Sequence, residues 1–168
     1  MQFINSQSKR KFKVLKDQKE FFFGVQPNWY SSRIEFRFED KSFEIRKNNF
    51  WGTSFECLIN GLIIAEMSLI WRKENTIKFK EKIDDEFQEY QLRSKRSKGW
   101  LSPDKVYTLT NKLNSPVLKI NFSYKKFWKE EIHLEFIDKE NYALMMCAMF
   151  IIRQRQDADG ASSAFAAG

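Results

Sequence analysis

An uncharged stretch of eleven residues near the end of the chain, residues 142–152, constrains the fold more than any other feature. It contains no Gly and no Pro, and charged residues flank it on both sides. A helix that is apolar on every face must be buried on every face. Most of the chain before this stretch has the alternating pattern of β-strands, so we expect a sheet wrapped around a C-terminal helix.

The predicted helix spans residues 139–155, with Asp138 as its N-cap. Arg153 and Arg155 would then stand near its C-terminal end, where cations suit the helix dipole. Residues 157–168 are small and polar without periodicity, and they predict a flexible tail. The structural core of the helix is expected to consist of Tyr142, Leu144, Met145, Met146, Met149, Phe150 and Ile151.

The chain before the helix predicts about ten to twelve short strands. Ile34, Phe36 and Phe38 alternate with charged residues, which is the pattern of a half-buried strand. Asn60-Gly61 lies between apolar flanks and predicts a hairpin with a type I′ turn, because both central residues of that turn need positive φ. Further strands are predicted over residues 68–71, 76–79, 86–93, 106–110, 117–123 and 132–136.

Together these elements predict a mainly β domain, a closed antiparallel barrel of about 10–12 strands around a fully buried, hydrophobic C-terminal helix. A helix is about 10 Å across, so a barrel that houses one needs more strands than a small barrel has. A β-sandwich with a packed C-terminal helix is the alternative. We predict that residues 1–30 form a basic N-terminal arm, separate or joined to the barrel edge, and that the barrel spans residues 31–156.

The formal net charge of +7 favours anionic partners, namely nucleic acid, a phospholipid surface or an acidic protein surface. Residues 1–20 are polar and basic, without the apolar region of a secretory signal. The apolar stretch of eleven residues is shorter than the roughly 20 that a transmembrane span needs. We therefore expect a cytoplasmic protein, either free or peripheral to the membrane.

Few residues suit catalysis. His133 is the only histidine and shares one strand face with Glu135, which predicts a solvent-facing position. Cys57 and Cys147 both stand in apolar runs, so we expect free buried thiols rather than nucleophiles. The adjacent carboxylates at residues 84–86 and 130–131 stand at turns or strand starts, which does not make them converge. We predict no catalytic site, no metal and no cofactor.

Basic residues interleaved with tryptophan are the best candidates for binding. Cations can hold phosphates while an indole inserts at an interface or stacks on a base. The candidate residues for an anionic head group form two clusters: Arg93, Lys95, Arg96, Lys98 and Trp100, and then Lys125, Lys126, Trp128 and Lys129. A third basic cluster occupies residues 9–13. The alternative interpretation of all three clusters is a solvated basic loop.

The pattern resembles the tubby-like barrel, the fold of tubby C-terminal domains, phospholipid scramblases and LURP-one-related proteins. The resemblance is carried by the Asn60-Gly61 hairpin, a second hairpin over residues 107–120 and the apolar helix of residues 142–152. It implies a barrel closed around a central helix. With the basic clusters, it favours a non-enzymatic module that docks on anionic phospholipid. The alternatives are a structural or protein-interaction barrel with no small ligand, and nonspecific nucleic-acid binding.

Overall fold

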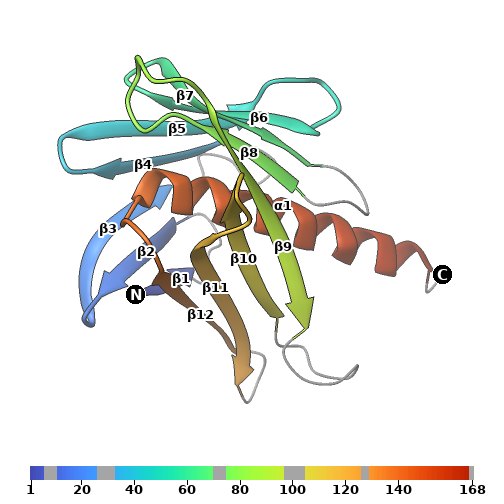
Figure 1. Cartoon of the computed structure of the whole chain (residues 1–168). Coiled ribbons are helices and arrows are strands. Elements are labelled where there is room, and N and C mark those ends of the chain that lie inside the picture. Colours follow the sequence, from blue (N-terminus) through green and yellow to red (C-terminus); the bar gives the residue numbers. More distant parts are fainter. Residues whose placement is uncertain (6–10, 26–32, 70–74, 97–104, 126–128, 167–168) are drawn as a thin grey trace.

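The computed structural model of the chain describes residues 1–5, 11–25, 33–69, 75–96, 105–125 and 129–166. These residues form an antiparallel sheet of eleven strands, β2 to β12, with one C-terminal helix, α1, packed against it (Figure 1). The predicted mainly β class with a C-terminal helix is therefore confirmed.

Each strand of this sheet pairs with its neighbours in the chain, and every pairing is antiparallel. The strand predicted over residues 68–71 is not separate in the described residues, because Ser68 is the last residue of β7 and residues 70–74 lie outside them. The structure describes twelve strands, the eleven of this sheet and β1: β1 Gln2–Asn5, β2 Lys11–Lys16, β3 Lys19–Val25, β4 Ile34–Phe38, β5 Lys41–Lys47, β6 Ser54–Ile59, β7 Leu62–Ser68, β8 Asn75–Phe79, β9 Gln88–Arg96, β10 Lys105–Asn111, β11 Pro116–Lys125 and β12 Lys129–Phe136.

The predicted N-terminal arm supplies three strands, β1, β2 and β3. β1 pairs on one side with β2 and on the other with β12, so that Gln2 lies opposite both Leu15 and His133. The backbone of Met1 continues this pairing, because its carbonyl accepts a hydrogen bond from the Leu134 N–H and its amino group donates one to the Leu134 carbonyl. The first residues of the chain are thus hydrogen-bonded to its last strand.

The Asn60-Gly61 hairpin is confirmed. Both residues have positive φ, 49° and 85°, and the flanking residues Ile59 and Leu62 pair directly as the ends of β6 and β7. Glycine and asparagine tolerate this left-handed backbone better than other residues do. The later predicted hairpin joins β10 to β11, and Asn114 in its turn also has a positive φ, 60°.

Gly24 of β3 is needed for a different reason. It lies opposite Phe12 of β2, and the Phe12 ring occupies the space that a side chain at position 24 would need. A Cβ built on Gly24 would stand 2.1 Å from Phe12 Cζ. The missing side chain therefore lets an aromatic ring from the neighbouring strand lie across the glycine and pack into the core.

The helix α1 spans Tyr142–Ala166, which corrects the prediction at both ends. The Asn141 side chain accepts a hydrogen bond from the Leu144 N–H at 3.0 Å, so Asn141 rather than Asp138 is the N-cap. Both residue types cap well, and Asn141 stands directly before the apolar stretch. Residues 157–166, predicted to form a tail, continue the helix. This segment is rich in alanine, the strongest helix former, and Arg153 and Arg155 lie inside the helix.

The apolar part of α1 is buried on all sides. Residues 144–152 are buried without exception, while Tyr142 is partly exposed where the helix begins. The Phe150 ring meets Phe55 of β6 edge-on, with ring centroids 4.9 Å apart, and the Arg153 guanidinium lies over Phe122 of β11. The helix also packs against β7 and β8. Figure 1 shows it running between β4–β8 and the remaining strands.

Candidate functional site

The antiparallel order brings alternate strand ends to the same end of the sheet. Six of the twelve strand-end residues at one end are basic and none is acidic. We call this the basic end. Its strand-end residues are Asn5, Lys11, Val25, Ile34, Lys47, Ser54, Ser68, Asn75, Arg96, Lys105, Lys125 and Lys129.

The opposite end of the sheet carries the opposite charge, and we call it the acidic end. Its turns comprise residues 17–18, 39–40, 60–61, 80–87 and 112–115, together with the segment 137–141 that leads into α1. They hold four lysines, at positions 80, 82, 112 and 139, against nine carboxylates. The carboxylates are Asp17, Glu39, Asp40, Glu81, Asp84, Asp85, Glu86, Asp138 and Glu140.

The two predicted basic clusters that contain tryptophan begin on strands that meet at the basic end. Arg93 and Lys95 are exposed on β9, and Arg96 is the last residue of that strand. Lys125 ends β11 and pairs with Lys129, which begins β12. β10 alone separates β9 from β11, so the structure brings the two clusters to neighbouring strand ends. Lys98, Trp100, Lys126 and Trp128 lie outside the described residues.

The tryptophans are also unevenly distributed between the two ends of the sheet. Each of the five follows a strand that ends at the basic end and precedes a strand that begins there. None stands in the sequence that joins strands at the acidic end. Trp51 is the tryptophan that falls within the described residues; the other four are Trp29, Trp71, Trp100 and Trp128.

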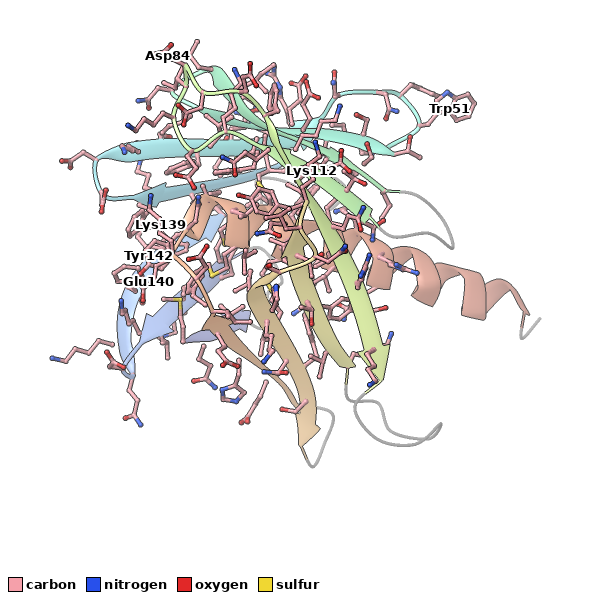
Figure 2. The ribbon with its side chains drawn as sticks, in the orientation of Figure 1. Trp51, Asp84, Lys112, Lys139, Glu140 and Tyr142 are labelled. Carbon is pink, nitrogen blue, oxygen red and sulfur yellow. The ribbon has the colours of Figure 1, made fainter. Side chains whose placement is uncertain are left out.

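The turn between β5 and β6, residues 48–53, carries two functional candidates that the sequence analysis missed. We call it the aromatic turn. The side chains of Phe50 and Trp51 are 91% and 82% exposed, and their rings meet edge-on with centroids 5.5 Å apart. Figure 2 shows Trp51 at one extremity of the molecule, far from Asp84 and Tyr142. The available signal was two adjacent aromatics between Asn49 and Gly52, both turn-forming residues.

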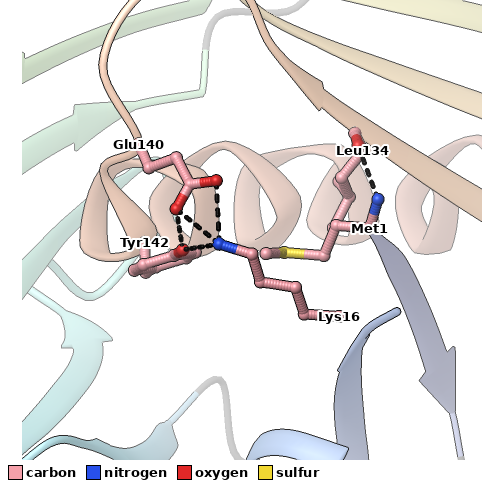
Figure 3. Close-up of polar contacts among 5 residues, drawn as sticks. All are labelled: Met1, Lys16, Leu134, Glu140 and Tyr142. Atoms are coloured by element: carbon pink, nitrogen blue, oxygen red, sulfur yellow. Dashed lines mark hydrogen bonds and ion pairs between the residues drawn. The ribbon is translucent and has the colours of Figure 1, made fainter. Parts of the chain in front are cut away.

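At the acidic end, a polar cluster ties β2 to the start of α1 (Figure 3). Lys16 Nζ donates to Glu140 Oε2 at 2.9 Å and to the Tyr142 hydroxyl at 3.3 Å, and that hydroxyl donates to Glu140. The Tyr142 ring packs on Phe21 and Phe38. The cluster is mutually satisfied, and its geometry is that of a structural contact between the sheet and the helix.

Among the described residues, the single histidine is exposed and the two cysteines are buried. His133 is exposed on β12, 3.8 Å from Glu131, as its strand face predicts. Cys57 and Cys147 are free and fully buried. Burial, and then a hydrogen bond with Cys57, raise the pKa of the Cys147 thiol, which disfavours the reactive thiolate. Within the described residues, no group of three or more His, Cys, Asp or Glu could hold a metal ion.

Comparison of the chain with family models, curated proteins and solved structures found no match. In the described part of the chain, no helix is both long enough and apolar enough to cross a membrane. The candidate site therefore rests on geometry: a basic end with exposed aromatic side chains, opposite an acidic end.

Proposed function

We propose that the chain is a tubby-like barrel, closed around α1, that docks on anionic phospholipid surfaces without catalysing a reaction. The pairing of β1 with both β2 and β12 supports closure of the sheet. The complete burial of residues 144–152 supports a central helix, because neighbours on every side are needed to cover an apolar helix. Both features are those that the resemblance implies.

The observation that carries the docking proposal is the separation of charge along the strands. Basic residues end six strands at the basic end and three, Lys16, Lys19 and Lys41, at the acidic end, where the nine carboxylates of the turns still outnumber the cations. A net charge of +7 spread evenly would attract anions to any face. The separation instead favours one orientation, with the basic end toward the anionic surface.

The proposed head-group contacts are Arg93, Lys95, Arg96 and Lys98, joined by Lys125, Lys126 and Lys129, with Trp100 and Trp128 at the lipid interface. A Lys or Arg near an anionic bilayer contributes about 1 kcal/mol to binding. Several such contacts acting together give a reversible association, which suits a protein peripheral to the membrane.

Two charge reversals test the proposal. Lys95→Glu alters the basic end, and Lys112→Glu makes the same change of net charge at an exposed position of the acidic end. Sedimentation with phosphatidylserine-containing vesicles should show binding about tenfold weaker for Lys95→Glu, because reversal exchanges an attraction for a repulsion. Lys112→Glu should bind nearly as the unchanged protein does, because the Debye length is about 8 Å at physiological salt.

Equal weakening by both reversals would mean that binding follows net charge alone, which contradicts a docking face. Binding that survives joint replacement of Lys95, Arg96 and Lys98 by Ala would remove these residues from the site. If vesicles bind no protein even at low salt, phospholipid docking is wrong, and the protein-interaction alternative takes its place. A gel shift with nucleic acid, lost steeply as salt rises, would favour the remaining alternative.

A further inference from the structure

The aromatic turn exposes more apolar surface than its place in the fold explains. Phe50 and Trp51 are adjacent and almost fully exposed, whereas the aromatic residues facing the core are buried. Isolated exposed apolar residues are common on protein surfaces. Two neighbouring large aromatics in one turn are different, because together they form a continuous apolar protrusion that is mostly exposed.

The turn holds this protrusion in a fixed shape. Asn49 Oδ1 accepts hydrogen bonds from the Thr53 and Ser54 N–H groups at 3.1 and 3.2 Å, and Asn49 Nδ2 donates to Thr53 Oγ1 at 2.9 Å. Gly52 supplies a positive φ of 67°. The Thr53 carbonyl accepts from the Leu69 N–H, which connects the turn to the end of β7. A turn ordered in advance loses little conformational entropy when its side chains are buried by a partner.

The charge around the turn fits an anionic partner. Residues 47–54 contain one cation, Lys47, and no acid. The Lys47 side chain lies over the turn, since a Cβ built on Gly52 would come 3.5 Å from its Nζ. The nearest carboxylate along β6, Glu56, is paired with Arg46 at 3.4 Å. The Lys47 cation thus lies over Gly52, the residue that follows Trp51, and a cation and an indole in one turn are typical of membrane interfaces.

We propose that the aromatic turn is the apolar anchor of the protein on an anionic phospholipid bilayer. Phe50 and Trp51 enter the boundary between head groups and acyl chains, while Lys47 stays at the level of the phosphates. This inference rests on the proposed function and adds a contact that the basic clusters do not supply. Charge brings the basic end to the membrane, and the two aromatic rings hold it there.

A fluorescent probe on the turn tests the anchor. Phe50→Cys is labelled with an environment-sensitive fluorophore, and Leu113→Cys serves as the control, because Leu113 is an exposed apolar residue, 83% accessible, in a turn of the acidic end. The native thiols, Cys57 and Cys147, are fully buried and should not react. On vesicles of phosphatidylcholine and phosphatidylserine, the probe at position 50 should brighten and shift to the blue, and the probe at position 113 should not.

Sedimentation of the same samples separates this inference from the proposed function. Protein that sediments with vesicles while the position-50 probe stays in water overturns the anchor and leaves docking intact. Protein that does not sediment overturns both. As a second measure, Phe50→Ser with Trp51→Ser should weaken vesicle binding about 10-fold to 100-fold, the effect of losing about half of the burial of two side chains of this size. Leu113→Ser should leave it unchanged, and equal binding by the double variant would contradict the anchor.

Discussion

At the residue scale, three groups at the start of α1 shift one another's ionisation. Hydrogen bonds from Tyr142 and then Lys16 lower the pKa of the Glu140 carboxyl. The hydrogen bond to Glu140, followed by that to Tyr142, raises the pKa of Lys16. Burial, and then the contact with Glu140, raise the pKa of Tyr142. Stability should therefore change with pH at both ends of the range, because the groups titrate differently in the folded and unfolded protein.

The sign follows from the direction of each shift. The contribution of Glu140 to the stability of the folded protein is present above the ordinary carboxyl pKa of about 4.3. It is lost as the pH falls through the lower pKa that Glu140 has in the folded protein. The contributions of Lys16 and Tyr142 to stability are present below about pH 10. They are lost as the pH rises through the raised pKa values that these groups have in the folded protein. Urea denaturation should show that Glu140→Gln flattens the acidic limb of the stability curve. Glu86→Gln, a change at another exposed carboxylate of the acidic end, should keep that limb, and the same flattening there would refute the assignment.

At the element scale, the sequence is informative where a single physical requirement decides the structure. Asn60-Gly61 predicts its hairpin because the turn needs two positive φ angles, and few residue pairs supply them. The helix is predictable from residues 142–152 because an apolar stretch without strand-like alternation has to be covered on every face. From these two elements and the alternating strands between them, the sequence predicts a mainly β fold with a C-terminal helix.

Other features depend on tertiary context that no local pattern contains. Asp138 and Asn141 are equally good caps by type, and only the hydrogen bond to the Leu144 N–H distinguishes them. Phe50 and Trp51 are large aromatic residues of the kind that usually pack in a core, and their exposure depends on how the turn projects from the sheet. The basic clusters were visible in the sequence, but the antiparallel strand order is what brings their strand ends together.

The burial of the apolar part of α1 leads to a stability prediction. Met146 is 1% exposed in the middle of the apolar stretch, so Met146→Asp would bury a carboxylate without a partner. We expect a loss of about 3–5 kcal/mol or more, comparable with the whole stability of a marginal domain. Circular dichroism and urea denaturation should show an unfolded or severely weakened protein. Met146→Leu, which nearly conserves volume, should cost less than about 1.5 kcal/mol. A soluble, folded Met146→Asp protein with an unchanged midpoint would contradict a central helix.

At the scale of the whole molecule, the basic charge and the two most exposed aromatic side chains among the described residues, Phe50 and Trp51, lie at the same end of the sheet. The basic strand ends and the aromatic turn share one end of the sheet, and the carboxylate-rich turns occupy the other. Figure 2 shows Trp51 and Glu140 on opposite sides of the molecule. A protein with this polarity is drawn to an anionic surface with its acidic end turned away, because the two ends interact with that surface in opposite senses. If the protein docks as proposed, we therefore expect its orientation to depend on the whole charge distribution and not on a single lysine.

Hydrogen–deuterium exchange on vesicles tests this orientation without any substitution. Peptides that cover residues 47–54 and 93–96 should exchange more slowly when vesicles containing phosphatidylserine are present, because the bilayer covers the basic end. Peptides that cover residues 80–87 and 112–115, at the acidic end, should exchange at the same rate with and without vesicles. Vesicles of phosphatidylcholine alone are the control, and there both sets should exchange as in solution. Slower exchange at the acidic end, or equally at both ends, would show that the charge separation does not orient the protein.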